Sequence, residues 1–322
     1  MGSLMGSSVN PDTFRVGLIL TEKCNISCRH CWFDCGPEKT ATMRLEEAYS
    51  YIEQAVEIPT VEWISFTGGE PFLVYDMMKT LIGYASSKGL RTECVTNCFW
   101  AESVEAAEKC LRSLMEAGLD VINISVDDFH QEYIPFSRVK NCFQASKALD
   151  LKIVLMSASA RSNEFRMERI TELLGGDILT RNHRDLEHPE AIAVETCFLP
   201  VGRGARIPES ELILGSEPTQ GPCRSVLRDI GVTPLREVLP CCSGASLLEI
   251  MRLGDASTER LKEKLEKASR RRLFRILSSE GPEGIQKLLG YDEPIRYVNR
   301  CHMCYHTLAK SSHLYSTLLK DV

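Results

Sequence analysis

The chain has 322 residues, of which 43% are hydrophobic and 25% are charged, and its formal net charge is −6. This composition is typical of a globular protein with one large α/β domain and a smaller module. The acidic balance argues against a nucleic-acid-binding surface, and no apolar run approaches the roughly 20 residues that cross a membrane. No signal-peptide pattern opens the chain, so we expect a cytoplasmic protein whose 14 cysteines bind metal or stay reduced rather than form disulfides.

Short apolar segments alternate with amphipathic segments over the first 200 residues. Strands are predicted at Phe14–Leu20, Trp63–Phe66, Arg91–Val95, Val121–Ser125, Ile153–Ser157 and Ile192–Thr196. Helices are predicted at Leu45–Val56, Met77–Lys88, Val104–Ala117, Ser137–Asp150 and Phe165–Leu174. Repeated β–α units predict a parallel sheet with right-handed crossovers. Six units do not close an eight-stranded barrel, so we predict an α/β fold, a partial (β/α)6 barrel over residues 13–200, after a disordered tail of residues 1–12.

The pattern changes after residue 200. Glycines and prolines punctuate residues 202–222, where helical periodicity is lost. A strand pair is predicted at Ser225–Ile230 and Arg236–Leu239, and one charged helix at Glu259–Leu277. We therefore predict a small, cysteine-rich C-terminal domain over residues 201–322.

Polar and cysteine residues follow each of the first five predicted strands, at the end of the barrel where chemistry takes place. In strand order they are Cys24, Gly68-Gly69-Glu70-Pro71, Thr96-Asn97, Ser125 to His130, and Ser159-Ala160-Arg161. Because these strand ends meet at one mouth, we expect an active site there.

Cys24, Cys28 and Cys31 follow the first strand with the spacing C-x-x-x-C-x-x-C. Three thiolates at this spacing can hold three irons of a cubic [4Fe–4S] cluster and leave the fourth iron open. The motif resembles that of the radical S-adenosylmethionine (radical SAM) superfamily, whose core fold is a partial barrel. The resemblance implies that the open iron binds S-adenosyl-L-methionine and that one electron, from a flavodoxin- or ferredoxin-type donor, cleaves it to a 5′-deoxyadenosyl radical.

Gly68-Gly69-Glu70-Pro71 resembles the G-G-E motif of the same superfamily. In that family the motif contacts the amino group of the cofactor. Glycines let the backbone approach a ligand closely, and a carboxylate stabilises a bound ammonium. The alternative is a plain turn before a helix, with Pro71 in its first turn.

The resemblance also implies cofactor contacts for Asn97 and Ser125, whose polar groups suit the ribose and carboxylate of the cofactor. Asn97 as a helix cap is the alternative. Arg161 is expected to pair with the cofactor carboxylate, unless it is a plain surface arginine. His30 stands where the family often has an aromatic residue against adenine, and Trp32 is expected to share that role.

Four further residues are candidates for the reaction itself. Asp127 or His130 is expected to orient a substrate or move a proton. The alternative, preferred for Asp128, is that Asp128 caps the following helix, with His130 in its first turn. Cys35 and Cys98 lie on loops at the catalytic end, and either thiol would suit hydrogen-atom return to a substrate radical. The alternative for both cysteines is an inert loop position.

Four more cysteines lie beyond residue 200, at Cys223, Cys241, Cys301 and Cys304. They could hold tetrahedral zinc or a second iron–sulfur cluster, and their spacing does not separate the two. The order of a cysteine, a hairpin, a Pro-Cys and a final C-x-x-C resembles the twitch form of the SPASM extensions found in radical SAM proteins. That resemblance implies one auxiliary [4Fe–4S] cluster, and Leu199 to Gly204 resembles the linker before such extensions.

Two residues depart from the twitch pattern or compete with it. Arg236 stands where the hairpin glycine is usual, so the turn must be built differently. Cys242 adjoins Cys241 and could replace it as a ligand.

The function expected is that of a radical SAM enzyme that abstracts a substrate hydrogen, with peptide modification (cross-linking, oxidation or epimerisation) preferred. Dehydrogenation of a sugar or other small metabolite is the alternative. Only about a dozen residues precede the first strand, which weakens a leader-dependent peptide substrate. A competing hypothesis of a different functional class is a non-catalytic electron-transfer or metal-binding protein. Such a protein would need Cys35 as the fourth ligand of the N-terminal cluster.

Overall fold

A computed structural model describes residues 12–180, 191–291, 295–310 and 318–320 of the chain. The expected disordered tail, residues 1–12, lies outside this part except for its last residue. No helix among the described residues is long and apolar enough to cross a membrane.

The described residues form a single nine-stranded sheet, in the order β6-β7-β5-β4-β3-β2-β1-β8-β9. Its strands are β1 Arg15–Thr21, β2 Trp63–Gly68, β3 Arg91–Thr96, β4 Val121–Ser125, β5 Lys152–Ser159, β6 Ile178–Leu179, β7 Ala191–Cys197, β8 Asp229–Val232 and β9 Val238–Leu239. All neighbouring strands are parallel except β8 and β9. The predicted α/β fold with a partial parallel barrel is confirmed.

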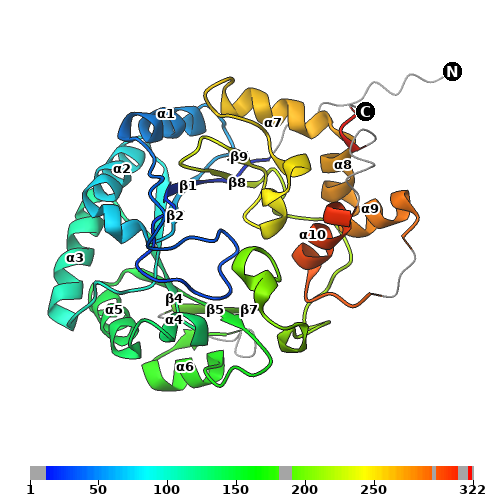
Figure 1. Cartoon of the computed structure of the whole chain (residues 1–322). Helices are drawn as coiled ribbons and strands as arrows, with labels where there is room; N and C mark the ends of the chain where they lie inside the picture. Colours follow the sequence, from blue (N-terminus) through cyan, green and yellow to red (C-terminus); the bar gives the residue numbers. More distant parts are fainter. Residues whose placement is uncertain (1–11, 181–190, 292–294, 311–317, 321–322) are drawn as a thin grey trace.

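Helices cover the outer face of the curved sheet (Figure 1). They are α1 Leu45–Val56, α2 Tyr75–Ser87, α3 Val104–Ala117, α5 Phe136–Ala148 and α6 Met167–Leu174, with the short α4 Asp128–Gln131 before α5. Their apolar faces pack on strands whose side chains are almost all buried, such as β1 and β4. Local signals set the ends of α3, because Ser103 accepts from the Ala106 amide and Gly118 follows with a φ of 115°.

Among the described residues, the C-terminal part adds helices on the open side of the barrel: α7 Leu261–Arg270, α8 Arg272–Ser279, α9 Pro282–Leu289 and α10 Arg300–Lys310 (Figure 1). The prediction of one helix at Glu259–Leu277 is wrong. The chain is extended at Arg271 (φ −67°, ψ 134°), which separates α7 from α8. The Arg272 amide donates to the Lys320 carbonyl, a contact far along the sequence that no local pattern indicates.

The predicted strand pair after residue 200 is present, but it begins later in each segment and belongs to the main sheet. β8 pairs with β1 in parallel, with Arg15 opposite Asp229, and β9 returns antiparallel to β8. The turn between them places Arg236 at a φ of 66°. Arg236 thus adopts the left-handed conformation that a glycine takes most easily.

Candidate functional site

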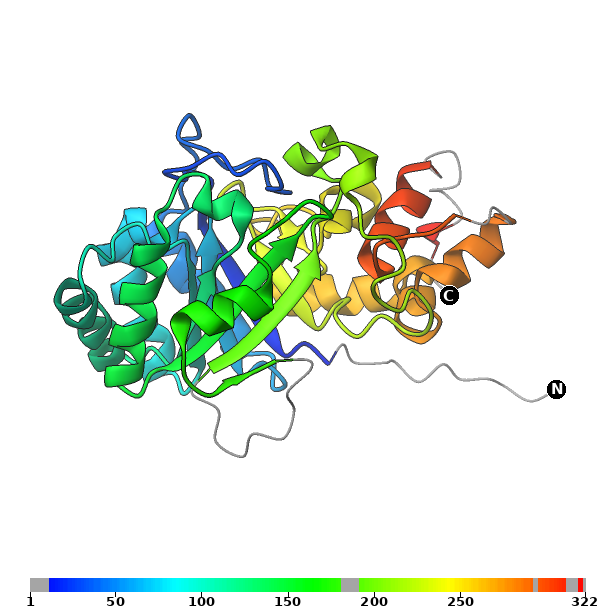
Figure 2. The ribbon, with the colours of Figure 1, turned by 90° about the horizontal axis from the view of Figure 1, so that it is seen from below.

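The loop between β1 and α1 carries the first three cysteines and lies over the mouth of the barrel (Figures 1 and 2). Cys24 and Cys28 are buried and Cys31 is half-buried. Backbone bonds close the loop, since the Cys24 amide donates to the Gly36 carbonyl at 3.1 Å and the Cys31 amide to the Cys28 carbonyl at 3.2 Å. The three thiols are therefore held in one preformed loop at the carboxyl ends of the strands.

Cys35 also belongs to this loop and is buried. Its thiol donates a hydrogen bond to Cys31, which lowers the pKa of Cys31 to about 6 against the opposing effect of burial. The same contact raises the pKa of Cys35. Burial raises the pKa of Cys24 to about 12. The structure thus places a fourth thiol, Cys35, beside Cys31 in the same loop.

A segment just after β7 holds the cysteine loop from the other side. The Arg203 guanidinium donates to the Cys28 carbonyl at 2.9 Å, and the Arg203 amide donates to the Cys31 carbonyl at 3.0 Å. Gly202 has a φ of 59°, and a Cβ there would lie 2.4 Å from the Trp32 carbonyl oxygen. Sequence reasoning treated these residues only as a linker, although the G-R-G pattern is a signal for close backbone packing.

Gly68 ends β2 and Gly69 follows it, and both let the backbone come close to the end of β1 and the residues after it. A Cβ on Gly69 would lie 2.2 Å from the Lys23 carbonyl oxygen, and one on Gly68 would lie 2.4 Å from that of Thr21. The Gly69 amide donates to the Thr21 carbonyl at 2.7 Å. The two glycines therefore fix where the cysteine loop begins.

Glu70 is completely buried at the end of β2. Its carboxylate accepts from the Asn97 amide at 2.8 Å, the Thr96 hydroxyl at 3.0 Å and the Phe72 amide at 3.2 Å. Burial nevertheless raises the pKa of Glu70 to about 7. A buried carboxylate with a raised pKa is poised to receive a cation such as an ammonium.

Asn97 adjoins the first cysteine, as the strand-end argument predicts. Its side-chain amide donates to Asn25 Oδ1 at 2.9 Å and lies 3.9 Å from Cys24 Sγ, while its oxygen accepts from the Phe99 amide at 3.0 Å. Ser125 ends β4 and is half-buried. The guanidinium of Arg161 donates to the backbone carbonyls of Ser210 and Leu212.

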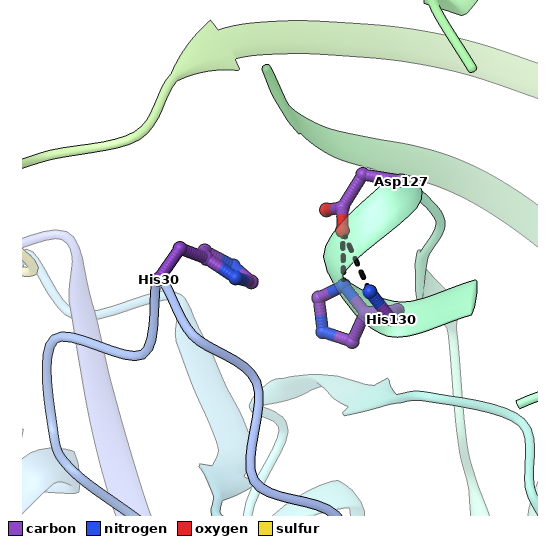
Figure 3. A group of neighbouring side chains, drawn as sticks. All are labelled: His30, Asp127 and His130. Atoms are coloured by element: carbon purple, nitrogen blue, oxygen red, sulfur yellow. Dashed lines mark hydrogen bonds and ion pairs between the residues drawn. The ribbon is translucent and has the colours of Figure 1, made fainter. Parts of the chain in front are cut away.

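Asp127 and His130 form a bonded pair at the end of β4 (Figure 3). Asp127 Oδ1 accepts from His130 Nδ1 at 2.8 Å and from the His130 amide at 3.0 Å. Burial opposes the charge of Asp127, yet His130 lowers the pKa of Asp127 to about 2. Asp127 is the residue that caps α4, so the expectation that Asp128 is the cap is wrong. Asp128 instead accepts from the Phe165 amide at 3.1 Å.

His30 projects from the cysteine loop toward this pair (Figure 3). Its ring stacks on Phe129 at 4.6 Å and meets His130 edge-on at 5.1 Å. Burial lowers the pKa of His30 to about 4, and its Nδ1 is buried without a hydrogen-bond partner. Trp32 packs instead on Phe33, with ring centroids 3.9 Å apart.

Cys35 and Cys98 lie in different parts of the packed interior. Cys35 packs with Cys24 and Cys28, whereas Cys98 packs in the main barrel core. Burial and the neighbouring Cys142 raise the pKa of the Cys98 thiol. Of the two expected hydrogen donors, only Cys35 is brought together with the cysteine loop.

The four C-terminal cysteines converge from three segments. Cys301 and Cys304 are one helical turn apart on α10, Cys241 follows β9, and Cys223 precedes β8. The Cys223 amide donates to the Leu277 carbonyl at 2.8 Å. Arg300, at the start of α10, donates to the Pro222 carbonyl at 2.8 Å and so ties the helix to the Cys223 segment.

Burial and mutual proximity raise the pKa of Cys241 and of Cys304. Cys241 lies near Cys242 and near the other three cysteines of this quartet, whereas burial and the neighbouring Asp229 raise the pKa of Cys242. Unpaired buried thiols that converge in this way suit a metal or cluster better than a plain core does.

The chemistry of both cysteine sets fits iron–sulfur clusters. The N-terminal set offers three thiols beside a buried carboxylate and an unpartnered imidazole nitrogen, which suits a cluster with a polar ligand on its open iron. The C-terminal set offers four thiols, enough for a fully ligated cluster or for zinc.

The fold and the site together define a class of protein. It is the class of α/β proteins whose parallel barrel holds a metal cluster over the carboxyl ends of its strands. Residues 18–151 match the family model of the Radical SAM superfamily. This segment of the chain is therefore a radical SAM domain, and that family implies S-adenosylmethionine and a [4Fe–4S] cluster as cofactors.

The chain is similar to several known proteins. YydG of Bacillus subtilis (strain 168), named as a candidate peptide biosynthesis protein, is 25% identical over 320 residues, 95% of this chain and 96% of YydG. A GTP 3′,8-cyclase of Chlorobaculum tepidum is 30% identical over 172 residues, 52% of this chain and 50% of the cyclase.

Two solved structures are similar to the chain at low sequence identity. BtrN, in complex with AdoMet and 2-DOIA, is 15% identical with a TM-score of 0.49, covering 83% of this chain and 87% of BtrN. Streptococcus suis SuiB, bound to its precursor peptide SuiA, is 12% identical with a TM-score of 0.47. The match covers 91% of this chain and 70% of the SuiB chain. Both likenesses are too remote to bear on function.

Proposed function

We propose that the chain is a radical SAM enzyme that modifies a peptide. The observation that carries the proposal is the convergence of Cys24, Cys28 and Cys31 with buried Glu70 at the mouth of the barrel. The three cysteines would hold a [4Fe–4S] cluster, and Glu70 would bind the amino group of the cofactor. When bound, the cofactor supplies a primary carbon radical that can take hydrogen from an unactivated carbon.

The residues of the chain would position and shield this chemistry. The Arg203 segment and the glycines Gly68 and Gly69 hold the cysteine loop in place from two sides. His30 and Phe129 would give an apolar surface beside the cluster. Asn97 would contribute a polar group next to Cys24. Closure of this kind protects a reactive radical from solvent.

A peptide is favoured as the substrate because the similarity to YydG runs over almost the whole of both chains. The similarity to the GTP 3′,8-cyclase covers only about half of each chain and so does not support a shared substrate. Cross-linking and oxidation would remove hydrogen from the peptide, whereas epimerisation would return it. Cys35 is the better placed of the two thiols for that return.

We also propose that Cys223, Cys241, Cys301 and Cys304 hold an auxiliary [4Fe–4S] cluster, with Cys241 rather than Cys242 as the ligand. Such a cluster would accept an electron from a substrate radical or anchor the substrate. Iron and sulfide analysis tests both clusters. The wild type should hold about eight irons after anaerobic reconstitution, and the Cys24/Cys28/Cys31→Ala variant about four. About four irons in the wild type, all lost in the variant, would remove the auxiliary cluster.

The activity itself is tested anaerobically with S-adenosylmethionine, a reductant and a panel of peptides. We expect 5′-deoxyadenosine from the wild type and none from the triple cysteine variant. Loss of two hydrogens would identify oxidation or cross-linking, and deuterium uptake from heavy water without another mass change would identify epimerisation. Absence of 5′-deoxyadenosine from a fully loaded wild type would refute the proposal.

A non-catalytic iron–sulfur protein is the second candidate, since Cys35 is hydrogen-bonded to Cys31 and could complete a four-thiolate set. Cys35→Ala separates the two candidates. A cluster held by three cysteines should keep its iron and its cofactor cleavage in this variant. Loss of both would favour the electron-transfer protein.

A further inference from the structure

Three side chains that can ligate a metal come together beside the cysteine loop: His30, Asp127 and His130 (Figure 3). Each offers one ligand atom, and these atoms all lie within 4.8 Å of one another. His30 belongs to the loop between β1 and α1, whereas Asp127 directly follows β4 and His130 lies in α4. Two imidazoles and a carboxylate, from two separate segments of the chain, therefore meet in one small volume.

Asp127 and His130 are already held in place by the barrel. Asp127 Oδ1 accepts from His130 Nδ1 at 2.8 Å, and two ligands of one ion lie about 3 Å apart when each is about 2.1 Å from it. The second oxygen of Asp127 accepts from the Ala158 amide of β5 at 3.0 Å, and Asp127 is only 2% exposed. Ligating carboxylates commonly have such a supporting hydrogen bond. Two of the three donors are thus fixed at a suitable spacing.

His30 supplies an independent observation that points to a ligand. Its Nδ1 is buried without a hydrogen-bond partner in the described part of the chain, and a buried polar atom of this kind is costly unless water or an ion engages it. The His30 ring stacks on Phe129 at 4.6 Å and meets the His130 ring edge-on at 5.1 Å. Packing therefore directs this imidazole toward the other two donors, as Figure 3 shows.

The two segments that carry the donors are tied to each other beside the group. The Arg29 guanidinium donates to the Glu132 carboxylate at 2.8 Å, and the Tyr133 hydroxyl donates to the Ser27 carbonyl at 3.0 Å. Both bonds join the cysteine loop to the residues directly after α4. An ion would draw the donor atoms from within 4.8 Å to about 3–3.5 Å of one another. A rotation of the His30 side chain can supply that change while the backbone stays in place.

We propose that His30, Asp127 and His130 bind one divalent transition-metal ion, such as Fe²⁺, Co²⁺ or Zn²⁺. Imidazole nitrogens favour these ions, whereas Ca²⁺ and Mg²⁺ take oxygen ligands. Three protein donors leave coordination positions open, which water or the carboxylate of a small molecule would fill. The site uses none of the cysteines assigned to the two clusters, so it does not depend on the proposed function.

The test is anaerobic equilibrium dialysis of the reconstituted full chain against Co²⁺, without S-adenosylmethionine, followed by cobalt, iron and sulfide analysis. The clusters then occupy the cysteines, and an unchanged iron content shows that cobalt has not displaced iron. We expect about one bound cobalt per chain.

Three variants locate the bound ion. His30→Phe keeps an aromatic ring against Phe129 but removes a donor, and His130→Leu removes a second donor. The dissociation constant for Co²⁺ should be at least about tenfold higher in both variants. His306→Gln is the matched control, because it removes an imidazole of α10, and it should bind cobalt like the wild type.

A wild type that binds no cobalt would overturn the inference, and so would His30→Phe and His130→Leu variants that bind it as tightly as the wild type. If the histidine variants do not fold, Asp127→Asn carries the test. Asparagine keeps an oxygen that can accept from the Ala158 amide but lacks the negative charge, so cobalt should bind at least about tenfold more weakly. Unchanged binding in Asp127→Asn would overturn the inference as well.

Failure of the proposed function is a separate outcome. A wild type that holds no N-terminal iron–sulfur cluster would refute that function and not this site. The same dialysis of Cys24/Cys28/Cys31→Ala, alone and combined with His30→Phe, then tests the site without the thiols of the loop. Equal cobalt binding in these two variants would overturn the inference.

Discussion

Replacement of Glu70 by glutamine tests the electrostatics of the site in the metal-free protein. The carboxyl of Glu70 has a pKa of about 7 in the fold against 4.5 in a free chain, because burial disfavours the ionised form. Between these two values the folded protein binds a proton that the unfolded chain has lost. Stability must therefore fall as pH rises from about 4.5 to about 7, and this penalty remains constant above that range.

The size of the effect follows from the same values. Each pKa unit corresponds to about 1.4 kcal/mol, so a rise from 4.5 to about 7 amounts to about 3.5 kcal/mol over the whole titration. Glutamine does not titrate and removes this cost. It also loses part of the bonding to Asn97 and Phe72, a pH-independent cost of about 1–3 kcal/mol. The pH dependence therefore isolates the ionisation of Glu70.

The assay is urea unfolding of chelator-treated wild type and Glu70→Gln at a series of pH values. From pH 5 to pH 8, the free energy of unfolding of the variant should gain about 2.5 kcal/mol relative to the wild type, because part of the titration lies below pH 5. Glu47→Gln is the control, because Arg44 lowers the pKa of that carboxyl and it stays ionised throughout this range. Its difference from the wild type should be flat. Parallel curves for Glu70→Gln and wild type would refute the reasoning.

Two further predictions concern backbone conformation. Gly69→Ala should cost about 1–3 kcal/mol of unfolding free energy, because its Cβ would lie 2.2 Å from the Lys23 carbonyl. Urea unfolding checks this against Gly83→Ala in α2, where the Cβ has ordinary contact distances and stability should rise by about 0.5–1 kcal/mol. An undamaged Gly69→Ala would contradict the packing described. Arg236→Gly should raise stability by up to about 1 kcal/mol, since glycine relieves the positive φ and the lost surface ion pairs are weak. A lower thermal midpoint would show that those pairs outweigh the relief.

The barrel and the cysteine motif were predictable from sequence because both depend on local patterns. Buried strands such as β1 and β4 appear as short apolar runs, and amphipathic helices such as α3 carry their own end signals at Ser103 and Gly118. Strand ends in a parallel sheet meet at one edge, so the proximity of Asn97 to the first cysteine also followed.

What sequence reasoning missed depends on contacts between distant segments. Arg203 reaches back across the chain to the Cys28 carbonyl, and no periodicity encodes that partner. The break at Arg271 is supported by Lys320 near the other end of the chain. At the end of β4, Asp127 and Asp128 are chemically equal candidates for the cap, and the Ala158 amide of β5 engages the first of them.

The pairing of β1 with β8 has a consequence for how the chain folds. Arg15 of β1 is bonded to Asp229 of β8 at 2.8 Å, 214 positions later, so β1 keeps an open edge until most of the protein has been synthesised. An unpaired edge strand invites association with other chains, and contacts this distant in sequence form slowly. A fragment that ends near residue 200 would expose that edge permanently. Nascent chains of this protein should therefore depend on chaperones until β8 emerges from the ribosome.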